Sequence, residues 1–201
     1  RARSNVISRW AYLGDEWSGR TDTMRPLEAS VNRETLQNMQ GWLPFADQFG
    51  IWDYLVIGQL NGAAPYTCIP AMKENFKLYG KYGITRYFSE IELGKNIQVM
   101  SFYDLAIYLN VKLMEDPHRD AEKVITDFMT KYYGAASEVM HLLFRDLVRL
   151  QTENPRSLGT APPAQWEHLN LDFFIHADQK LTLAEKLVAA EPDALRRVKF
   201  E

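Results

Sequence analysis

Short apolar runs alternate with longer segments of helical periodicity in the first half of the chain. Three runs are rich in β-branched and aromatic residues, which is typical of buried strands: Asn5–Leu13, Ile51–Ile57 and Ile84–Glu90. Apolar residues at spacings of three and four between these runs predict helices over Arg33–Gln48 and Ile69–Tyr82. This order of elements indicates a parallel sheet or barrel whose crossover helices cover one side of the strands.

Helix signals refine the boundaries of these two helices. Ser30 or Asn32 is a candidate N-cap for the first helix, and Pro44 inside it is expected to cause a kink. Gly50 is expected to end the first helix and Gly83 the second, because glycine accepts the left-handed conformation common after a helix.

The second half of the chain is almost continuously helical in pattern from about Ile97 onward. Asp116-Pro117 is expected to end the first of these helices, and Asp120 to cap the next. Gly134 interrupts the pattern before it resumes, and the remaining segments are a helix over Ala135–Thr152, a linker over Asn154–Gln165 and a last helix from Asn170 to Ala190, before Pro192. We therefore divide the chain into a partial barrel, residues 1–115, and a helical region, residues 116–201.

Composition excludes several classes of protein. Of 201 residues, 46% are hydrophobic and 24% charged, as in a globular protein with a buried core. The 23 basic and 26 acidic side chains give a net charge of −3, without the basic clustering of nucleic-acid-binding domains. No apolar run approaches the roughly 18 residues of a membrane helix, so we expect no membrane span.

The sequence contains no motif for a metal site, an internal disulfide or a nucleotide-binding loop. Cys68 is the only cysteine, so it forms neither an internal disulfide nor a cysteine-based zinc cage. No two of the four histidines have the i, i+4 spacing of a zinc-binding helix, and neither a phosphate-binding glycine loop nor a G-x-S-x-G segment occurs. We expect no metal and no cofactor in this chain.

Aromatic residues make up 12% of the chain, and many of them stand beside acidic or small residues. Flat rings with nearby carboxylates are used by sugar-binding clefts, because the apolar faces of pyranose rings pack on them. Hydrophobic cores use the same side chains, so composition leaves both interpretations open.

Candidate site residues follow the ends of the three predicted strands, where (β/α) barrels carry their chemistry. A glycoside hydrolase needs two carboxyl groups about 5 to 9.5 Å apart. We predict Glu90 and Asp53 as the catalytic carboxylates. The predicted substrate-binding residues are Asp15, Glu16, Trp17, Asn61 and Glu92.

Each carboxylate also has a structural interpretation. Asp53 stands early in an apolar strand, where it can be a buried carboxylate bonded to the backbone or to an arginine. Glu90 and Glu92 can form the solvated end of a strand, and Asp15 and Glu16 can belong to an ordinary loop.

Several short motifs occur in a fixed order from Val6 to Leu147. They are Trp52-Asp53-Tyr54, then Pro70, Asn75 and Gly83, then Leu113 with Asp116-Pro117, and last Tyr132-Tyr133-Gly134-Ala135-Ala136. With these motifs the chain resembles a bacterial family of uncharacterised domains associated with glycoside hydrolases.

The resemblance implies the C-terminal part of a TIM-type (β/α)8 barrel of the α-glucuronidase or β-hexosaminidase type, followed by a helical region. About three βα units would be present, with Val6–Leu13, Ile51–Ile57 and Ile84–Glu90 as the sixth, seventh and eighth strands. In such barrels the principal acid comes from the fourth strand, which would precede Arg1. Relatives tend to have Phe-Glu-Gln at the end of the last strand, whereas this chain has Phe88-Ser89-Glu90.

We therefore expect a piece of a glycoside hydrolase acting on a poly- or oligosaccharide. The expected partners are carbohydrate and the missing N-terminal half of the protein, or another copy, packed against the first strand. The resemblance also implies an extracellular or periplasmic location. One alternative is a non-catalytic carbohydrate-binding or scaffolding module, and another is a helical interaction domain that uses the last hundred residues.

Overall fold

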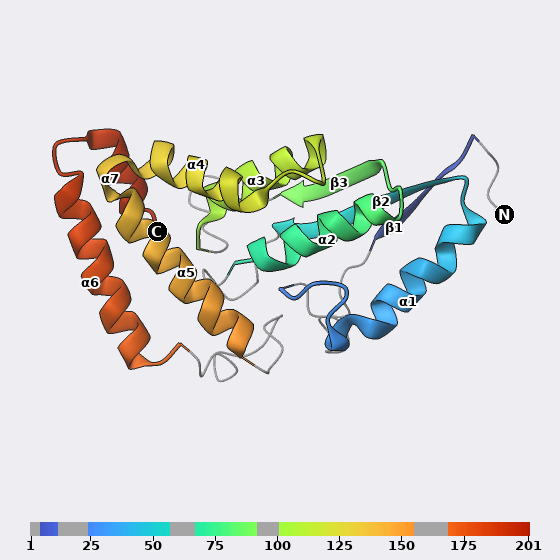
Figure 1. Cartoon of the computed structure of the whole chain (residues 1–201), viewed down its shortest axis with the longest axis horizontal. Helices are drawn as coiled ribbons and strands as arrows, with labels where there is room; N and C mark the ends of the chain where they lie inside the picture. Colours follow the sequence, from blue (N-terminus) through green and yellow to red (C-terminus); the bar gives the residue numbers. More distant parts are fainter. Residues whose placement is uncertain (1–4, 12–23, 57–66, 92–100, 155–168) are drawn as a thin grey trace.

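A computed structural model describes residues 5–11, 24–56, 67–91, 101–154 and 169–201 (Figure 1). Within these ranges the protein is a mixed α/β structure with a three-stranded parallel sheet and several helices. In Figure 1 the strands lie toward one end of the molecule, and the C-terminal helices lie toward the other end.

The three strands pair in sequence order. They are β1 (Ile7–Ala11), β2 (Gln48–Val56) and β3 (Arg86–Ile91). Both pairings are parallel, and the register places Trp10 beside Ile51 and Ile51 beside Tyr87. The prediction of three neighbouring parallel strands is confirmed.

Helix α2 (Ile69–Lys81) covers one face of this sheet. The Phe76 and Tyr79 rings of α2 lie 4.6 and 5.8 Å from the ring of Tyr87 in β3. Helix α1 (Arg33–Trp42) is joined to the end of α2 by a hydrogen bond from Gln40 Nε2 to the Tyr82 hydroxyl. The crossover helices therefore lie beside each other.

The boundary between the first helix and the second strand differs from the prediction. Helix α1 ends at Trp42, and a short 3-10 turn (Leu43–Phe45) that contains Pro44 follows it. Gly50 does not end the helix but lies inside β2, paired with Arg9 and Arg86. A Cβ atom on Gly50 would stand 3.2 Å from both the Cβ and the carbonyl oxygen of Arg86. The glycine is therefore needed because β2 and β3 lie close together at this point, and local sequence patterns do not reveal such a contact.

The N-terminal turn of α1 also differs from the expected capping arrangement. Asn32 occupies the N-cap position of α1, but its side chain makes no capping bond, and Ser30 lies in the 3-10 turn before it. The buried Asn32 amide instead donates to the carbonyl oxygens of Arg25 and Pro26, and so holds the preceding turn.

Other helix boundaries agree with short-range sequence signals. Gly83 has φ +65° directly after α2, as expected of a C-terminal glycine, and Ile84 N donates to Tyr79 O. The Asp120 side chain accepts from Lys123 N at 3.1 Å and caps its helix, and Asn170 caps a later helix by accepting from Phe173 N.

Five α-helices follow β3 among the described residues. Their bounds are α3 (Tyr103–Glu115), α4 (Ala121–Tyr133), α5 (Ser137–Glu153), α6 (Leu171–Leu187) and α7 (Pro192–Val198). The predicted last helix ends before Pro192, and α7 was not predicted. Pro192 occupies the first turn of α7, where the missing N–H of proline costs no hydrogen bond.

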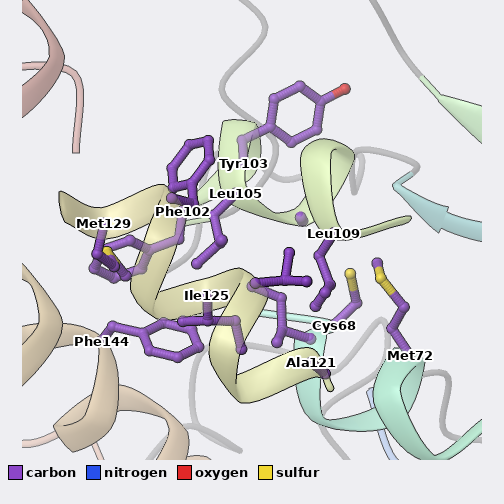
Figure 2. Packing of buried hydrophobic residues seen from close by; sticks show 14 of the residues in the cluster. Cys68, Met72, Phe102, Tyr103, Leu105, Leu109, Ala121, Ile125, Met129 and Phe144 are labelled. Carbon is purple, nitrogen blue, oxygen red and sulfur yellow. The ribbon is translucent and has the colours of Figure 1, made fainter. Parts of the chain in front are cut away.

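One hydrophobic cluster joins the helices of both parts of the chain. Figure 2 shows the sulfur atoms of Cys68 and Met72 beside Leu109 of α3. Further along the cluster, the Phe102 and Phe144 rings meet edge to face at 5.2 Å. The core therefore continues across the boundary placed between residues 115 and 116. None of the helices within the described ranges is long and apolar enough to cross a membrane.

Candidate functional site

The two faces of the sheet have different surroundings. Side chains alternate between the faces along each strand, so Ile51 and Asp53 point one way and Trp52 points the other. The first face packs on α2, because Asp53 and Tyr87 both contact residues of that helix. No described helix packs on the second face, which we call the open face.

Four side chains form a cluster on the open face. Trp52 Nε1 donates a hydrogen bond to Glu90 Oε2 at 3.0 Å, and the Trp52 ring meets the Phe88 ring edge to face at 5.0 Å. The Arg9 guanidinium lies 5.8 Å from the centroids of both rings. We call Arg9, Trp52, Phe88 and Glu90 the open-face cluster.

Strand register brings this cluster together. Trp52 pairs with Phe88, so their side chains stand in one row together with Ala11 of β1. Arg9 lies two residues before Ala11 on the same face. Glu90 lies two residues beyond Phe88 on the same face and near the carboxyl end of β3. Aromatic rings that meet edge to face stabilise each other by about 0.5–1.5 kcal/mol beyond the burial of their surface.

The open-face cluster brings two aromatic rings, a carboxylate and a guanidinium together. Glu90 and Trp52 are both half-buried, and Phe88 is exposed. The indole N–H is directed at one oxygen of the carboxylate, which fixes the orientation of the Glu90 side chain. A guanidinium over an aromatic face gains attraction from the ring electrons.

Asp53 lies on the opposite face from Glu90. Its side chain is 1% exposed, and its Oδ2 accepts a hydrogen bond from the Tyr79 hydroxyl of α2 at 3.3 Å. The nearby Cys68 thiol has its pKa raised by burial and, to a lesser degree, by the Asp53 charge. The structure therefore favours the structural interpretation of Asp53 and does not bring its carboxylate together with that of Glu90.

The other predicted site residues lie outside the described residues. These are Asp15, Glu16, Trp17, Asn61 and Glu92. Their roles stay predictions. In the described part of the chain, no three metal-ligating side chains come together.

Of the four members of the cluster, only Glu90 is among the predicted site residues, and Arg9, Trp52 and Phe88 are not. Arg9 stands in the first predicted strand, and Phe88 in the third, but neither follows a strand end. Side-chain alternation within each strand indicates which residues share a face. Only the register shows that Trp52 and Phe88 stand side by side.

Two buried asparagines make hydrogen bonds beside the sheet, one to a backbone N–H and one to a tyrosine hydroxyl. Asn75 Oδ1 in α2 accepts from Leu27 N at 2.8 Å. Asn110 Nδ2 in α3 donates to the Tyr87 hydroxyl at 3.3 Å. Asn75 is one of the residues that carry the family resemblance, and its contact shows a structural role.

The fold and site define a mixed α/β domain whose parallel sheet has helices on one face and an aromatic–carboxylate cluster on the other. Comparison with known protein families shows which family the domain belongs to. The chain belongs to the DUF4838 family, described as a domain of unknown function, whose model matches residues 2–143. No curated protein and no solved structure matches the chain significantly.

Proposed function

We propose that this chain is part of a glycoside hydrolase acting on a poly- or oligosaccharide. Its sheet would form the last three strands of a (β/α)8 barrel, and the open-face cluster would line the substrate cleft. The observation that carries the proposal is the Trp52–Glu90 pair, in which an aromatic ring and a carboxylate share the uncovered face.

The open face supports a barrel because parallel sheets are normally covered on both faces. In a barrel, helices cover the outer face and the inner face meets the other strands. The strands β1 and β3 form the two edges of the described sheet, and unpaired edges favour pairing with further strands. Val6 and Ile7 beside and within β1 are exposed, which agrees with pairing at that edge.

The chemistry of the cluster fits a sugar. The Trp52 and Phe88 rings offer apolar surface to a pyranose face, and Arg9 offers hydrogen-bond donors to its hydroxyl groups. Glu90 supplies a carboxylate held by the indole N–H. The second carboxyl group would come from Asp15, Glu16 or Glu92, or from the fourth strand that the resemblance implies.

A non-catalytic carbohydrate-binding or scaffolding module is the second candidate function. The burial of Asp53 favours it, because only Glu90 of the two predicted catalytic carboxylates stands on the open face. A binding module needs the rings and polar groups of the open-face cluster but no pair of carboxylates.

Substitution of Glu90 by Gln in the full-length protein tests the enzymatic proposal. We expect kcat/KM on a responsive aryl glycoside or oligosaccharide to fall by about 100-fold or more, since the loss of a catalytic carboxylate removes acid–base or nucleophilic assistance. The matched control is Glu74→Gln, because Glu74 lies on α2, away from the open face, and its carboxylate pairs with Lys77 of the same helix. Unchanged turnover and unchanged binding in Glu90→Gln, with the fold intact, would exclude a role for Glu90.

Substitution of Trp52 by Ala separates the two candidate functions. If the protein is a binding module, the wild type binds oligosaccharide without hydrolysing it, and Trp52→Ala weakens binding. If it is an enzyme, the same change lowers turnover as well. Either activity would be expected outside the cell or in the periplasm, as the family resemblance implies.

A further inference from the structure

Helix α6 carries apolar side chains on two sides. On its inner side, Phe173, Ala177 and Leu181 pack against the core cluster, and Ala184 is fully buried. On its outer side, four aliphatic side chains are between 44% and 73% exposed, and we call them the outer ridge: Leu171, Ile175, Leu183 and Leu187. A helix with one partner needs only one apolar side, so the outer ridge indicates a second partner.

The outer ridge follows the helix at intervals of four residues. Gln179 occupies the central position of the row, midway between Ile175 and Leu183. Rows of residues at i, i+4 are the ridges that pack into the grooves of a neighbouring helix. Figure 1 shows α6 at the left margin of the molecule, beside α5, so its outer side faces away from the other described elements.

We propose that the outer ridge binds a second copy of this chain, with the two α6 helices antiparallel and a twofold axis close to Gln179. A twofold interface uses the same surface on both subunits, so that surface must complement itself. In this arrangement Ile175 lies opposite Leu183 of the other copy, and the carboxamides of the two Gln179 residues can hydrogen-bond each other.

The charged residues beside the ridge match the antiparallel arrangement. Asp172 lies seven positions before Gln179, and Lys186 lies seven positions after it. An antiparallel copy therefore places each Asp172 near a Lys186, whereas a parallel copy in register would place like charges together. Opposite charges across an interface set the orientation of the partners.

Asp172 and Lys186 are both exposed, and in the described part of the chain no ion pair engages either of them. Two other charges of α6 are engaged within the chain. Lys180 pairs with Asp146 of α5, and Glu185 pairs with Lys199. Asp172 and Lys186 therefore remain available to pair with charges of a partner.

The expected association is weak. One helix of 17 residues is about 25 Å long, and a pair of such helices buries less than the roughly 800 Å² per partner of a standard interface. We therefore expect a reversible dimer with a dissociation constant in the micromolar range, visible by sedimentation velocity across a concentration series.

Substitutions in the ridge test the contact surface. Ile175→Asp in the full-length protein is expected to weaken dimerisation by about tenfold or more, since it places a charge in an apolar contact. The matched control is Val111→Asp, because Val111 is a branched side chain of similar exposure on α3. Circular dichroism confirms that both variants are folded.

Charge exchange tests the antiparallel orientation without changing the ridge. Asp172→Lys alone should weaken the dimer, because two lysines then face each other, and the double variant Asp172→Lys/Lys186→Asp should restore it. A wild-type protein that stays monomeric up to several hundred micromolar would overturn the proposal. So would an Ile175→Asp variant that dimerises as the wild type does, or a double exchange that fails to restore the dimer.

Discussion

Gln151 of α5 and Thr67 before α2 form a double hydrogen bond in the core. Thr67 N donates to Gln151 Oε1 at 2.9 Å, and Gln151 Nε2 donates to Thr67 O at 2.7 Å. The glutamine side chain thus pairs with a backbone unit as a neighbouring strand would. Both residues are buried, so this pair fixes α5 against the start of the helix that covers the sheet.

We predict that Gln151→Ala lowers the free energy of unfolding by about 2–3 kcal/mol, because a buried N–H and a buried C=O of Thr67 lose their partners. Chemical denaturation measures this change. Gln40→Ala is the control, since Gln40 bonds the Tyr82 hydroxyl at an exposed position and should cost far less. Equal losses in the two variants would show that burial of the Gln151 pair contributes nothing extra.

Gly50→Ala should destabilise the protein by about 1–3 kcal/mol, because the new methyl group meets the backbone of Arg86, which cannot move without disturbing β3. Gly41→Ala in α1 is the matched control, since no atom lies within 4 Å of its added Cβ. There we expect a gain of about 0.5–1 kcal/mol from helix propensity. Thermal unfolding of the two variants compares the effects, and a neutral Gly50→Ala would contradict the close packing of β2 and β3.

Glu201 introduces a pH dependence of stability. Its side chain accepts hydrogen bonds from Phe102 N at 2.7 Å and from the Tyr133 hydroxyl at 2.6 Å. Burial raises the pKa of Glu201 above its ordinary value of 4.5, an effect that the two hydrogen bonds only partly offset. The folded protein therefore binds this proton more tightly than the unfolded chain does.

The stabilising contribution of the Glu201 proton is fully present below about pH 4.5 and is lost as the pH rises through the raised pKa of the folded state. We predict that Glu201→Gln removes this decline. Urea denaturation at a series of pH values measures it, as the difference in unfolding free energy between wild type and variant. A difference that does not change with pH would contradict the raised pKa.

Cys68 reports on the opening of the core. The thiol is fully buried, and burial raises its pKa, so little of the reactive thiolate is present in the folded protein. Since this is the only cysteine, we expect alkylation by iodoacetamide to be at least about 100-fold slower in the native protein than in denaturant. Rapid labelling of the native protein would show that the region between α2 and α3 opens readily.

The order of elements could be predicted from the sequence because its signals act over short distances. Asp120 caps α4 through a bond to Lys123, three residues away, and Gly83 ends α2 through its own backbone conformation. The alternation of apolar runs with helical segments likewise predicted three neighbouring parallel strands.

Only the tertiary structure decided which residues meet. Thr67 and Gln151 pair across 84 positions, and Trp52 reaches Glu90 across 38. The sequence places Asp53 early in one predicted strand and Glu90 at the end of another, but the packing of the sheet puts Asp53 beneath α2 and Glu90 on the open face. Gly50 carries the signature of a helix end, yet its place in β2 depends on contact with Arg86. Turns and caps form within a few residues, whereas strand register and buried polar pairs depend on the packing of the whole core.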